Sequence, residues 1–248
     1  MRVIGAEADA EVYRDFWRTL RERIRENLLD RETVLFTGDC QTSQAMGIYY
    51  GLLEPEETAA GVERLIEIIH RDDELITTDV LGLRVIFHVL SEFGYSDPAY
   101  RMIATPQQPS YGYWVRKGNT TFEECMGEMN DGYPVSRNHH FMSDVSAWFM
   151  KCLCGINYNP DITEKKKIII RPHFINEIRS ARAYHVCAEG KIAVSYVNYK
   201  NEVLLSVEVP EGVDAEIRLH GFCNRLGRQQ FSAMTARYRL IRQKKRNA

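Results

Sequence analysis

This sequence lacks the features that would assign it to a membrane or secreted class. None of its apolar runs approaches the roughly 18–20 residues that a membrane-spanning helix needs. The first residues, MRVIGAEADAEVYRDF, contain no apolar signal core and turn acidic at once. We therefore expect no membrane span and no signal peptide. This predicts a cytoplasmic protein if Met1 is the natural start, and otherwise leaves the compartment unknown.

The sequence also lacks the spacing of a metal or nucleotide site. Its six cysteines are scattered without a CxxC pair, whereas zinc would need four ligands at recognisable spacing. Adjacent histidines at 139 and 140 have poor geometry for chelation from one helix face. The stretch GDCQTSQ lacks the lysine and glycines of a phosphate-binding loop, and no GxSxG motif occurs. We expect free, mostly buried thiols, no metal and no cofactor.

Acidic residues are missing from the last part of the chain. Residues 223–248 hold six Arg and two Lys without Asp or Glu, although the whole chain has a net charge of −2. Blocks of like charge are often interaction arms for nucleic acid or acidic membranes. Because this block has few aromatic residues, we favour a disordered basic tail and expect no nucleic-acid partner.

Helical periodicity dominates the first 160 residues. In residues 7–29, apolar side chains recur every four residues, at Val12, Phe16, Leu20, Ile24 and Leu28. Similar stripes predict further helices at about 38–53, 55–72, 79–93, 97–104 and 140–156. Consecutive helices joined by short connections pack as antiparallel hairpins. Residues 105–138 are rich in Pro, Gly, Asn and Tyr, which predicts a long loop, and long loops are often functional.

The period changes from helical to strand-like after residue 160. The run IIIRPHF is short and apolar, and GKIAVSYV alternates with a period of two before an Asn-Tyr-Lys-Asn turn. A second alternating run, EVLLSVEVP, and then AEIRLHGF follow this turn. These stretches predict a small antiparallel sheet that is far enough along the chain to form its own module.

Five segments occur in an order and spacing that resemble one known family. They are TGDCQTSQAMGIYYGLLEPEE, TTDVLGLRVIFHVLSEFGYSDPAY, PSYGYWVRKGNTTFEE, NHHFMSDVSAWFMKCLCGI and GKIAVSYV. Together they resemble the C-terminal part of α-L-rhamnosidases, glycoside hydrolase family 78, over about residues 1–220. The resemblance implies a mainly α fold. A partial (α/α)6 toroid of the six-hairpin glycosidase type would occupy residues 1–160, and a small antiparallel β-sandwich domain would occupy residues 161–222.

The resemblance also implies a reaction, the inverting hydrolysis of terminal α-L-rhamnosyl residues in rhamnoside substrates. Such a reaction needs one carboxyl group to protonate the leaving oxygen and another, about 6.5–9.5 Å away, to deprotonate a water. By its match to the family motif, Glu124 is the general base. The acidic-Arg-Trp motif that holds the family's general acid has no counterpart here, and Glu123 stands where the family usually has tryptophan.

Four further residues are predicted to bind substrate. His139 matches a family histidine that contacts sugar, and imidazole can hydrogen-bond a hydroxyl as donor or acceptor. Alternatively, it is a helix-start histidine that bonds backbone. The rings of Trp114, Tyr111 and Tyr113 could stack on the apolar face of a deoxysugar, or they pack in the core.

The missing motif and hairpins suggest a truncated chain and leave two interpretations open. One is an enzyme whose missing half of the barrel is supplied by another chain, and the other is a non-catalytic homologue that at most binds carbohydrate. Half a toroid would expose apolar patches, so we expect association or poor solubility. Glu128 could approach Glu124 on a turn, whereas Asp79 and Gly82 are expected to fix a helix entry.

Overall fold

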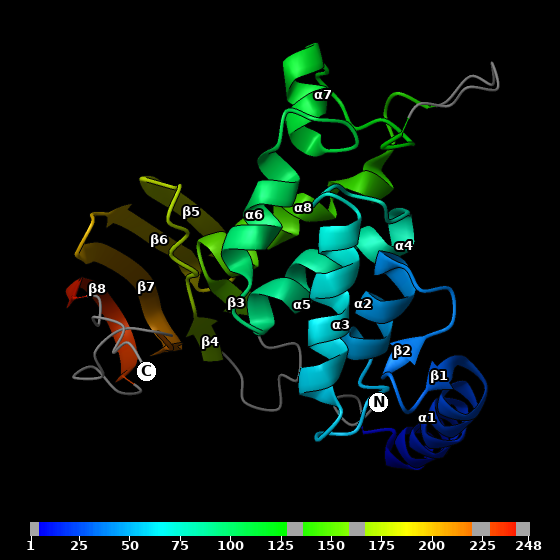
Figure 1. Ribbon diagram of the computed structural model, residues 1–248. Helices are drawn as coiled ribbons and strands as arrows, with labels where there is room; N and C mark the ends of the chain where they lie inside the picture. The colour runs from blue at the N-terminus through cyan, green and yellow to red at the C-terminus, as the bar shows by residue number, and fades with distance from the viewer. Residues whose placement is uncertain (1–4, 128–135, 159–166, 220–228, 242–248) are drawn as a thin grey trace. The chain divides into compact units, whose positions relative to one another are not determined.

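The structure, a computed structural model, describes residues 5–127, 136–158, 167–219 and 229–241. The chain divides into two compact units, Met1–Val145 and Ser146–Ala248. The first unit is helical and the second is built on a β-sheet (Figure 1). Within the described residues, no helix combines the length and the apolar character needed to cross a membrane.

Helices of one to six turns make up most of the first unit. In chain order it contains α1 (Glu7–Leu28), the strand pair β1 (Leu29–Asp30) and β2 (Leu35–Phe36), α2 (Gln41–Tyr49), α3 (Thr58–Arg71), α4 (Val80–Leu83), α5 (Ile86–Glu92), α6 (Ser96–Ala104), α7 (Tyr111–Lys117) and the 3-10 turn η2 (His140–Ser143). Helix α8 (Asp144–Trp148) and the π-helical turn η3 (Phe149–Leu153) continue the chain into the second unit.

The core of the helical unit lies between α2 and α3, which run side by side in Figure 1. The predicted stripe of α3 is buried, with Val62 and Leu65 at most 4% exposed. One polar side chain is buried with them. The amide of Gln44 donates to the carbonyls of Val34 and Gly61 and accepts from the Phe36 N–H, at 2.9–3.0 Å. Because all these groups are paired, a polar residue can fix α2 against β2 and α3 without a desolvation penalty.

Two helical predictions differ from the structure. The helix expected over 79–93 is interrupted between α4 and α5, where Val85 lies outside regular helical geometry. The loop expected over 105–138 contains α7, because Ser110 Oγ accepts from the Tyr113 N–H at 2.9 Å and caps it. Gly118, with φ of 84°, ends the same helix in the left-handed region that glycine favours.

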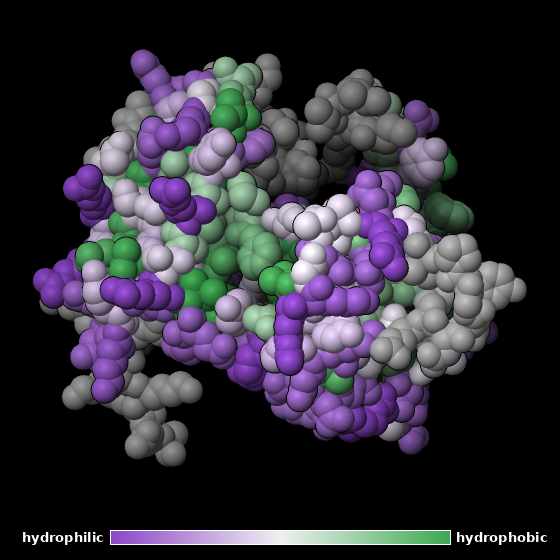
Figure 2. Space-filling model, turned by 90° about the horizontal axis from the view of Figure 1, so that it is seen from above, coloured by the Kyte–Doolittle hydropathy of each residue, from purple (hydrophilic) through white to green (hydrophobic). Residues whose placement is uncertain are grey.

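The stripe predicted on α1 is present but uncovered. Val12 and Phe16 are 66% and 64% exposed, and Leu20 is 45% exposed. The face of the molecule in Figure 2 likewise mixes hydrophilic residues with groups of hydrophobic ones. The exposed apolar surface expected for an incomplete helical array is therefore found on α1 within the described residues.

The second unit contains one six-stranded sheet among the described residues. Its strands are β3 (Ile156–Tyr158), β4 (Lys167–Ile170), β5 (Ser180–Cys187), β6 (Gly190–Asn198), β7 (Glu202–Ile217) and β8 (Gln229–Ile241). The order is β3-β4-β7-β6-β5, with β8 paired to the other edge of β7. The predicted hairpin is present as β6 and β7, with Val194 opposite Val207. The predicted last strand is the end of β7, where Asp214–Ile217 pairs in parallel with β4 after an irregularity at Val209/Asp214.

The expected domain limits of 1–160 and 161–222 differ from the observed division between Val145 and Ser146. The helix end belongs with the sheet because later residues satisfy its carbonyl groups. The His173 N–H donates to the Cys152 carbonyl at 2.9 Å, and the Arg171 N–H donates to the Gly155 carbonyl at 2.8 Å. These bonds tie η3 and β3 to the chain that follows β4.

The expectation of a disordered tail over 223–248 is corrected for Gln229–Ile241, which forms β8. A period of two explains this strand. Ala236 and Leu240 are buried, while Thr235, Arg237 and Arg239 are exposed. The basic residues that suggested disorder occupy the outward positions of a strand. Residues 220–228 and 242–248 of this stretch lie outside the described ranges.

Candidate active site

Two segments of the predicted loop pair with each other in the helical unit. The Glu124 N–H donates to the Ser136 carbonyl at 2.9 Å, and the His139 N–H donates to the Phe122 carbonyl at 2.8 Å. The hydroxyl of Thr121 also donates to the Arg137 carbonyl. These bonds hold residues 121–124 against 136–139, although about a dozen residues separate the two segments in the chain. Residues 128–135, including Glu128, lie outside the described residues.

This pairing brings Glu124 and His139 to one cavity of about 540 Å³. The predicted general base and the histidine predicted to contact sugar therefore line the same cavity, whose volume lies in the range of small-ligand sites. The lining residues Cys125, Met126 and Met142 are less polar and follow these two segments closely in the chain.

One oxygen of the Glu124 carboxylate is fixed by backbone. The Ser136 N–H donates to Oε2 at 2.9 Å, whereas Oε1 has no hydrogen bond to any described residue. Glu124 is exposed, so its free oxygen can accept a hydrogen bond from water. The neighbouring Glu123 does not line the cavity and has its carboxylate 4.0 Å from Lys117 Nζ. The two adjacent glutamates thus have different surroundings.

Neither ring nitrogen of His139 bonds to any described residue. Its contacts within the described residues are with rings, at centroid distances of 6.5 Å to His140 and 5.5 Å to Phe141. The alternative interpretation was a helix-start histidine that bonds backbone. The bond from His139 to backbone is made by its main-chain N–H, which donates to the Phe122 carbonyl, and not by its ring. The ring is half-buried at the cavity and can donate to or accept from a ligand hydroxyl.

The segment before α4 forms another part of the cavity wall, from Ile76 to Val80. Gln41 holds this segment, because its amide nitrogen donates to Asp72 Oδ2 at 3.0 Å and to the Leu75 carbonyl at 2.9 Å. The Ile76 N–H then donates to the Pro109 carbonyl at 3.2 Å, which joins the wall to the start of the long loop.

Asp79 is the second carboxylate that lines the cavity. Its Oδ1 accepts from the N–H groups of Leu81 and Gly82, each at 3.1 Å, so the predicted helix entry is confirmed. Gly82 is required there, since a Cβ atom would lie 2.7 Å from both Thr42 Oγ1 and Thr78 Cβ. The sequence marked Asp79 as a helix cap, but nothing local in the sequence placed it at the cavity.

The three aromatic residues predicted to stack on sugar do not line this cavity. Tyr111 and Trp114 are 6% and 4% exposed and pack edge to face at 5.5 Å. Phe122 joins them, with centroids 5.9 Å from Tyr111 and 6.4 Å from Trp114. Because Phe122 lies two residues before Glu124, this cluster anchors the segment that carries the carboxylate. Tyr113 is half-buried, and stacking by any of the three stays a prediction.

The Tyr111 hydroxyl ties the same cluster to η2. It donates to the Met142 carbonyl at 2.7 Å, and burial, with a smaller effect from the charge of Asp144, raises the pKa of the phenol. Asp144 itself lies 3.0 Å from the His88 ring, which links α8 to α5. Both walls of the cavity therefore rest on packed, hydrogen-bonded elements.

Cysteines and acidic residues give no sign of a metal centre in the part of the chain that the structure describes. Cys40, Cys125, Cys152, Cys154 and Cys187 are all free, and no group of three His, Cys, Asp or Glu side chains could hold an ion. Burial raises the pKa of the Cys154 thiol to about 11, as for a packed rather than a reactive cysteine.

Two adjoining family models match the chain, and both describe parts of a glycosidase. The bacterial alpha-L-rhamnosidase 6 hairpin glycosidase domain matches residues 1–153, and the bacterial alpha-L-rhamnosidase C-terminal domain matches residues 155–230. The chain belongs to the bacterial alpha-L-rhamnosidase 6 hairpin glycosidase domain family. The family expected from the five motifs is thereby confirmed.

Curated relatives and solved structures agree with this assignment. The chain is 26% identical to an alpha-L-rhamnosidase of Streptomyces avermitilis over 84% of its own length and 21% of the relative. It is 26% identical to one of an Alteromonas species over 86% of this chain and 24% of that one. The chain therefore spans about a fifth to a quarter of these relatives.

Solved structures show the same fold at lower identity. An alpha-L-rhamnosidase from Aspergillus terreus matches with a TM-score of 0.85 and 22% identity, covering 96% of this chain and 28% of that one. The Streptomyces avermitilis enzyme, solved in complex with L-rhamnose, matches with a TM-score of 0.80 and 23% identity over 94% of this chain and 24% of that one. This chain therefore shares its fold, helices followed by a C-terminal sheet, with the matched parts of these structures.

Proposed function

We propose that this chain carries the general-base side of an α-L-rhamnosidase active site, built on part of an (α/α)6 toroid that is followed by a β-sandwich-type domain. The observation that carries the proposal is that Glu124 and His139 line one cavity of about 540 Å³. Nothing in their separation along the chain requires them to meet. Family membership and the sequence motif support the same two residues.

In this mechanism Glu124 takes a proton from the water that attacks the anomeric carbon. Its Oε2 is held by the Ser136 N–H at 2.9 Å, so Oε1 is the oxygen that accepts the proton. His139 hydrogen-bonds a hydroxyl of the sugar and orients the ring. A second carboxyl group, about 6.5–9.5 Å from the base, protonates the leaving oxygen, and the configuration at the anomeric carbon inverts.

We assign the acid to a hairpin supplied from outside these 248 residues, in the same protein or in a partner chain. Two features support this. The acidic-Arg-Trp motif is absent from the sequence, and the other carboxylate at the cavity, Asp79, is engaged as a helix cap. The chain's length of about a fifth to a quarter of its relatives leaves room for such a contribution.

A 4-nitrophenyl α-L-rhamnoside tests the base directly, because its leaving group departs with little help from an acid. The 248-residue chain should hydrolyse it slowly, and Glu124→Gln should lower the rate by about 10²–10⁴-fold. Glu123→Gln is the matched control, since it removes an adjacent carboxylate that does not line the cavity. Equal losses in both variants would contradict the assignment of Glu124.

The second candidate function is a non-catalytic homologue that binds carbohydrate. The fraction of its relatives that the chain spans, 21–24%, favours this alternative. It predicts no turnover by the parent chain but measurable binding of L-rhamnose by calorimetry, weakened in His139→Ala. Absence of turnover would exclude the enzyme interpretation for this polypeptide.

A further inference from the structure

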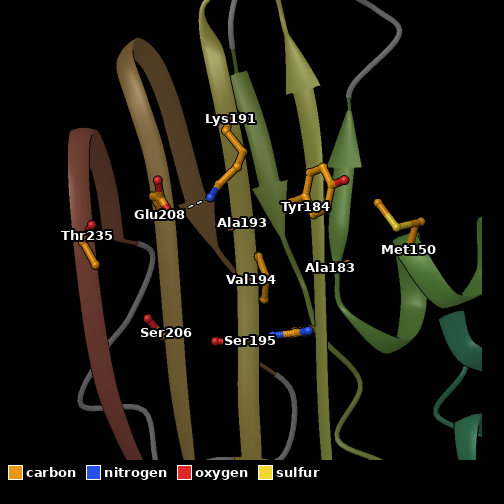
Figure 3. A pocket seen from close by; sticks show the side chains of 11 residues that line it. Met150, Ala183, Tyr184, Lys191, Ala193, Val194, Ser195, Ser206, Glu208 and Thr235 are labelled. Atoms are coloured by element: carbon orange, nitrogen blue, oxygen red, sulfur yellow. Dashed lines mark ion pairs between the residues drawn. The ribbon is translucent and has the colours of Figure 1, made fainter.

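The sheet unit has a cavity of its own, about 570 Å³, on the exposed side of β5, β6, β7 and β8 (Figure 3). Small side chains form its floor, at Ala193, Ser195 and Ser206. Tyr184 and Met150 stand at its side in Figure 3. None of these residues belongs to the candidate active site, which lies within the helical unit.

Strand register aligns four polar residues in one row across this face. Arg182 pairs with Ser195, Ser195 with Ser206, and Ser206 with Arg237. Directly paired residues of antiparallel strands lie on the same side of a sheet. The row therefore has a guanidinium group at each end and two hydroxyl groups between them. With neighbouring strands about 4.8 Å apart, its ends are separated by about 14 Å at the backbone.

The next row adds an aromatic ring and one acid. Tyr184 pairs with Ala193, Ala193 with Glu208, and Glu208 with Thr235. The carboxylate of Glu208 lies 3.6 Å from Lys191 Nζ, and Figure 3 shows these two side chains pointing toward each other. This pair is neutral as a unit. The ring of Tyr184 is 65% exposed beside the small Ala193.

Two arginines give this groove on the sheet face its positive charge: Arg182 lines the cavity, and Arg237 lies in the same row on β8. Neither Arg182 nor Arg237 makes a hydrogen bond or ion pair with any described residue, whereas Arg239, one row farther along β8, pairs with Glu202 at 2.5 Å. Tyr184 lies two residues from Arg182 on β5, so the face offers an exposed aromatic ring next to one guanidinium group, with the second on β8. This arrangement fits a ligand with both an apolar ring face and anionic oxygens. A pyranose offers C–H groups to an aromatic face, and a carboxylate accepts two parallel N–H donors from arginine.

We propose that this groove binds an acidic oligosaccharide, one whose sugar rings carry carboxylates as uronic acids do. A ring stacks on Tyr184, its hydroxyls bond Ser195 and Ser206, and carboxylates pair with Arg182 and Arg237. The choice of a sugar rests on the proposed function, but binding here involves none of the residues assigned to hydrolysis. The span of about 14 Å suits two or three sugar units.

Calorimetry on the full 248-residue chain tests this with tri-galacturonic acid as the probe and maltotriose as its uncharged counterpart. The parent chain should bind the acid trisaccharide and bind maltotriose at least about tenfold more weakly. Arg182→Ala and Arg237→Ala should each weaken binding about tenfold, because each removes a charged hydrogen-bond donor. Tyr184→Ala should weaken the binding of both trisaccharides.

Matched variants separate this site from the rest of the chain. Tyr199→Ala removes another exposed tyrosine, 47% exposed after β6, and should leave binding unchanged. Glu124→Gln should bind the trisaccharide like the parent while losing rhamnoside hydrolysis, so failure of either proposal is seen independently. No binding by the parent, equal binding of maltotriose, or equal binding of citrate as a simple polyanion would each overturn the assignment.

Discussion

Helices α1 and α3 carry similar apolar stripes but differ in what those stripes contact. In α3, Leu65 and Ile69 are at most 1% exposed and pack in the core of the helical unit. In α1, Val12 and Phe16 are about two-thirds exposed, at 66% and 64%. Both stripes recur every three to four residues, so the amphipathic pattern is sufficient to form each helix. Burial of the stripe depends on a neighbour that α1 lacks among the described residues.

Polar contacts attach the C-terminal end of α1 to the helical unit instead. Arg25, 4% exposed, donates to the Leu52 carbonyl and to Glu57 Oε2, each at 2.7 Å. Arg21 donates to the Gly51 carbonyl at 2.9 Å. All these partners lie in the connection between α2 and α3. Helix α1 is therefore attached through arginines at one end, while its apolar stripe stays exposed.

The largest difference between the two helices should appear on truncating a matched leucine. Leu65→Ala should lower the free energy of unfolding by about 3 kcal/mol, because the Leu65 side chain is fully buried and its truncation leaves a cavity in the core. Leu20→Ala, at a site 45% exposed, should cost less than about 1 kcal/mol. Urea unfolding followed by helical circular dichroism measures both. Equal costs would show that the α1 stripe is buried in solution.

The attachment of α1 should depend on pH through Glu57. The Arg25 guanidinium lowers the pKa of this carboxyl from 4.5 to about 2, despite the opposing effect of burial. Because the folded-state pKa is below the ordinary value, the ionised form stabilises the fold above pH 4.5, and this contribution is lost as the pH falls toward 2. Allowing for solvent around the carboxylate, it amounts to about 2 kcal/mol.

Glu57→Gln tests this, with Glu56→Gln as a control at an exposed neighbouring carboxylate. At pH 7 the Glu57 variant should be less stable than the parent by about 2 kcal/mol, and the gap should close between pH 4.5 and 2. Stability curves measured by urea unfolding at several pH values provide the comparison. A gap that stays constant with pH would mean that the ion pair does not hold α1.

The fold could be anticipated where its signals are local. The periodicity of apolar residues predicted α1, α3 and the β6–β7 hairpin, and Asp79 indicated the start of α4. Non-local contacts decided what was missed. The helix end at Cys152 joins the sheet unit through a hydrogen bond from His173, and β8 is a strand because it pairs with β7. In β8 the many arginines drew attention away from the alternation of buried and exposed side chains, in which Ala236 and Leu240 face the core.

The candidate site shows the same limit. Glu124 and His139 could be named from a motif, but their meeting depends on backbone bonds between two segments of a loop. The aromatic residues were predicted from residue type, with core packing left open, because residue type cannot distinguish a ring that faces a ligand from one that supports the chain. Tyr111 and Trp114 are buried against Phe122, and that packing is invisible in the order of residues.

A substitution in the apolar stripe of α1 should have the smallest effect on stability, but it tests most directly how this stripe differs from that of α3. Taken alone, the 248-residue chain should associate with increasing concentration, since Val12, Phe16 and Trp17 expose 47–66% of their surface on one helix. Phe16→Glu should shift light scattering toward the monomer while changing the free energy of unfolding by no more than about 0.5 kcal/mol. Val115→Glu, at a residue 76% exposed on α7, should leave association unchanged. A parent chain that remains monomeric at high concentration would contradict this prediction and show that exposure of this stripe does not drive self-association.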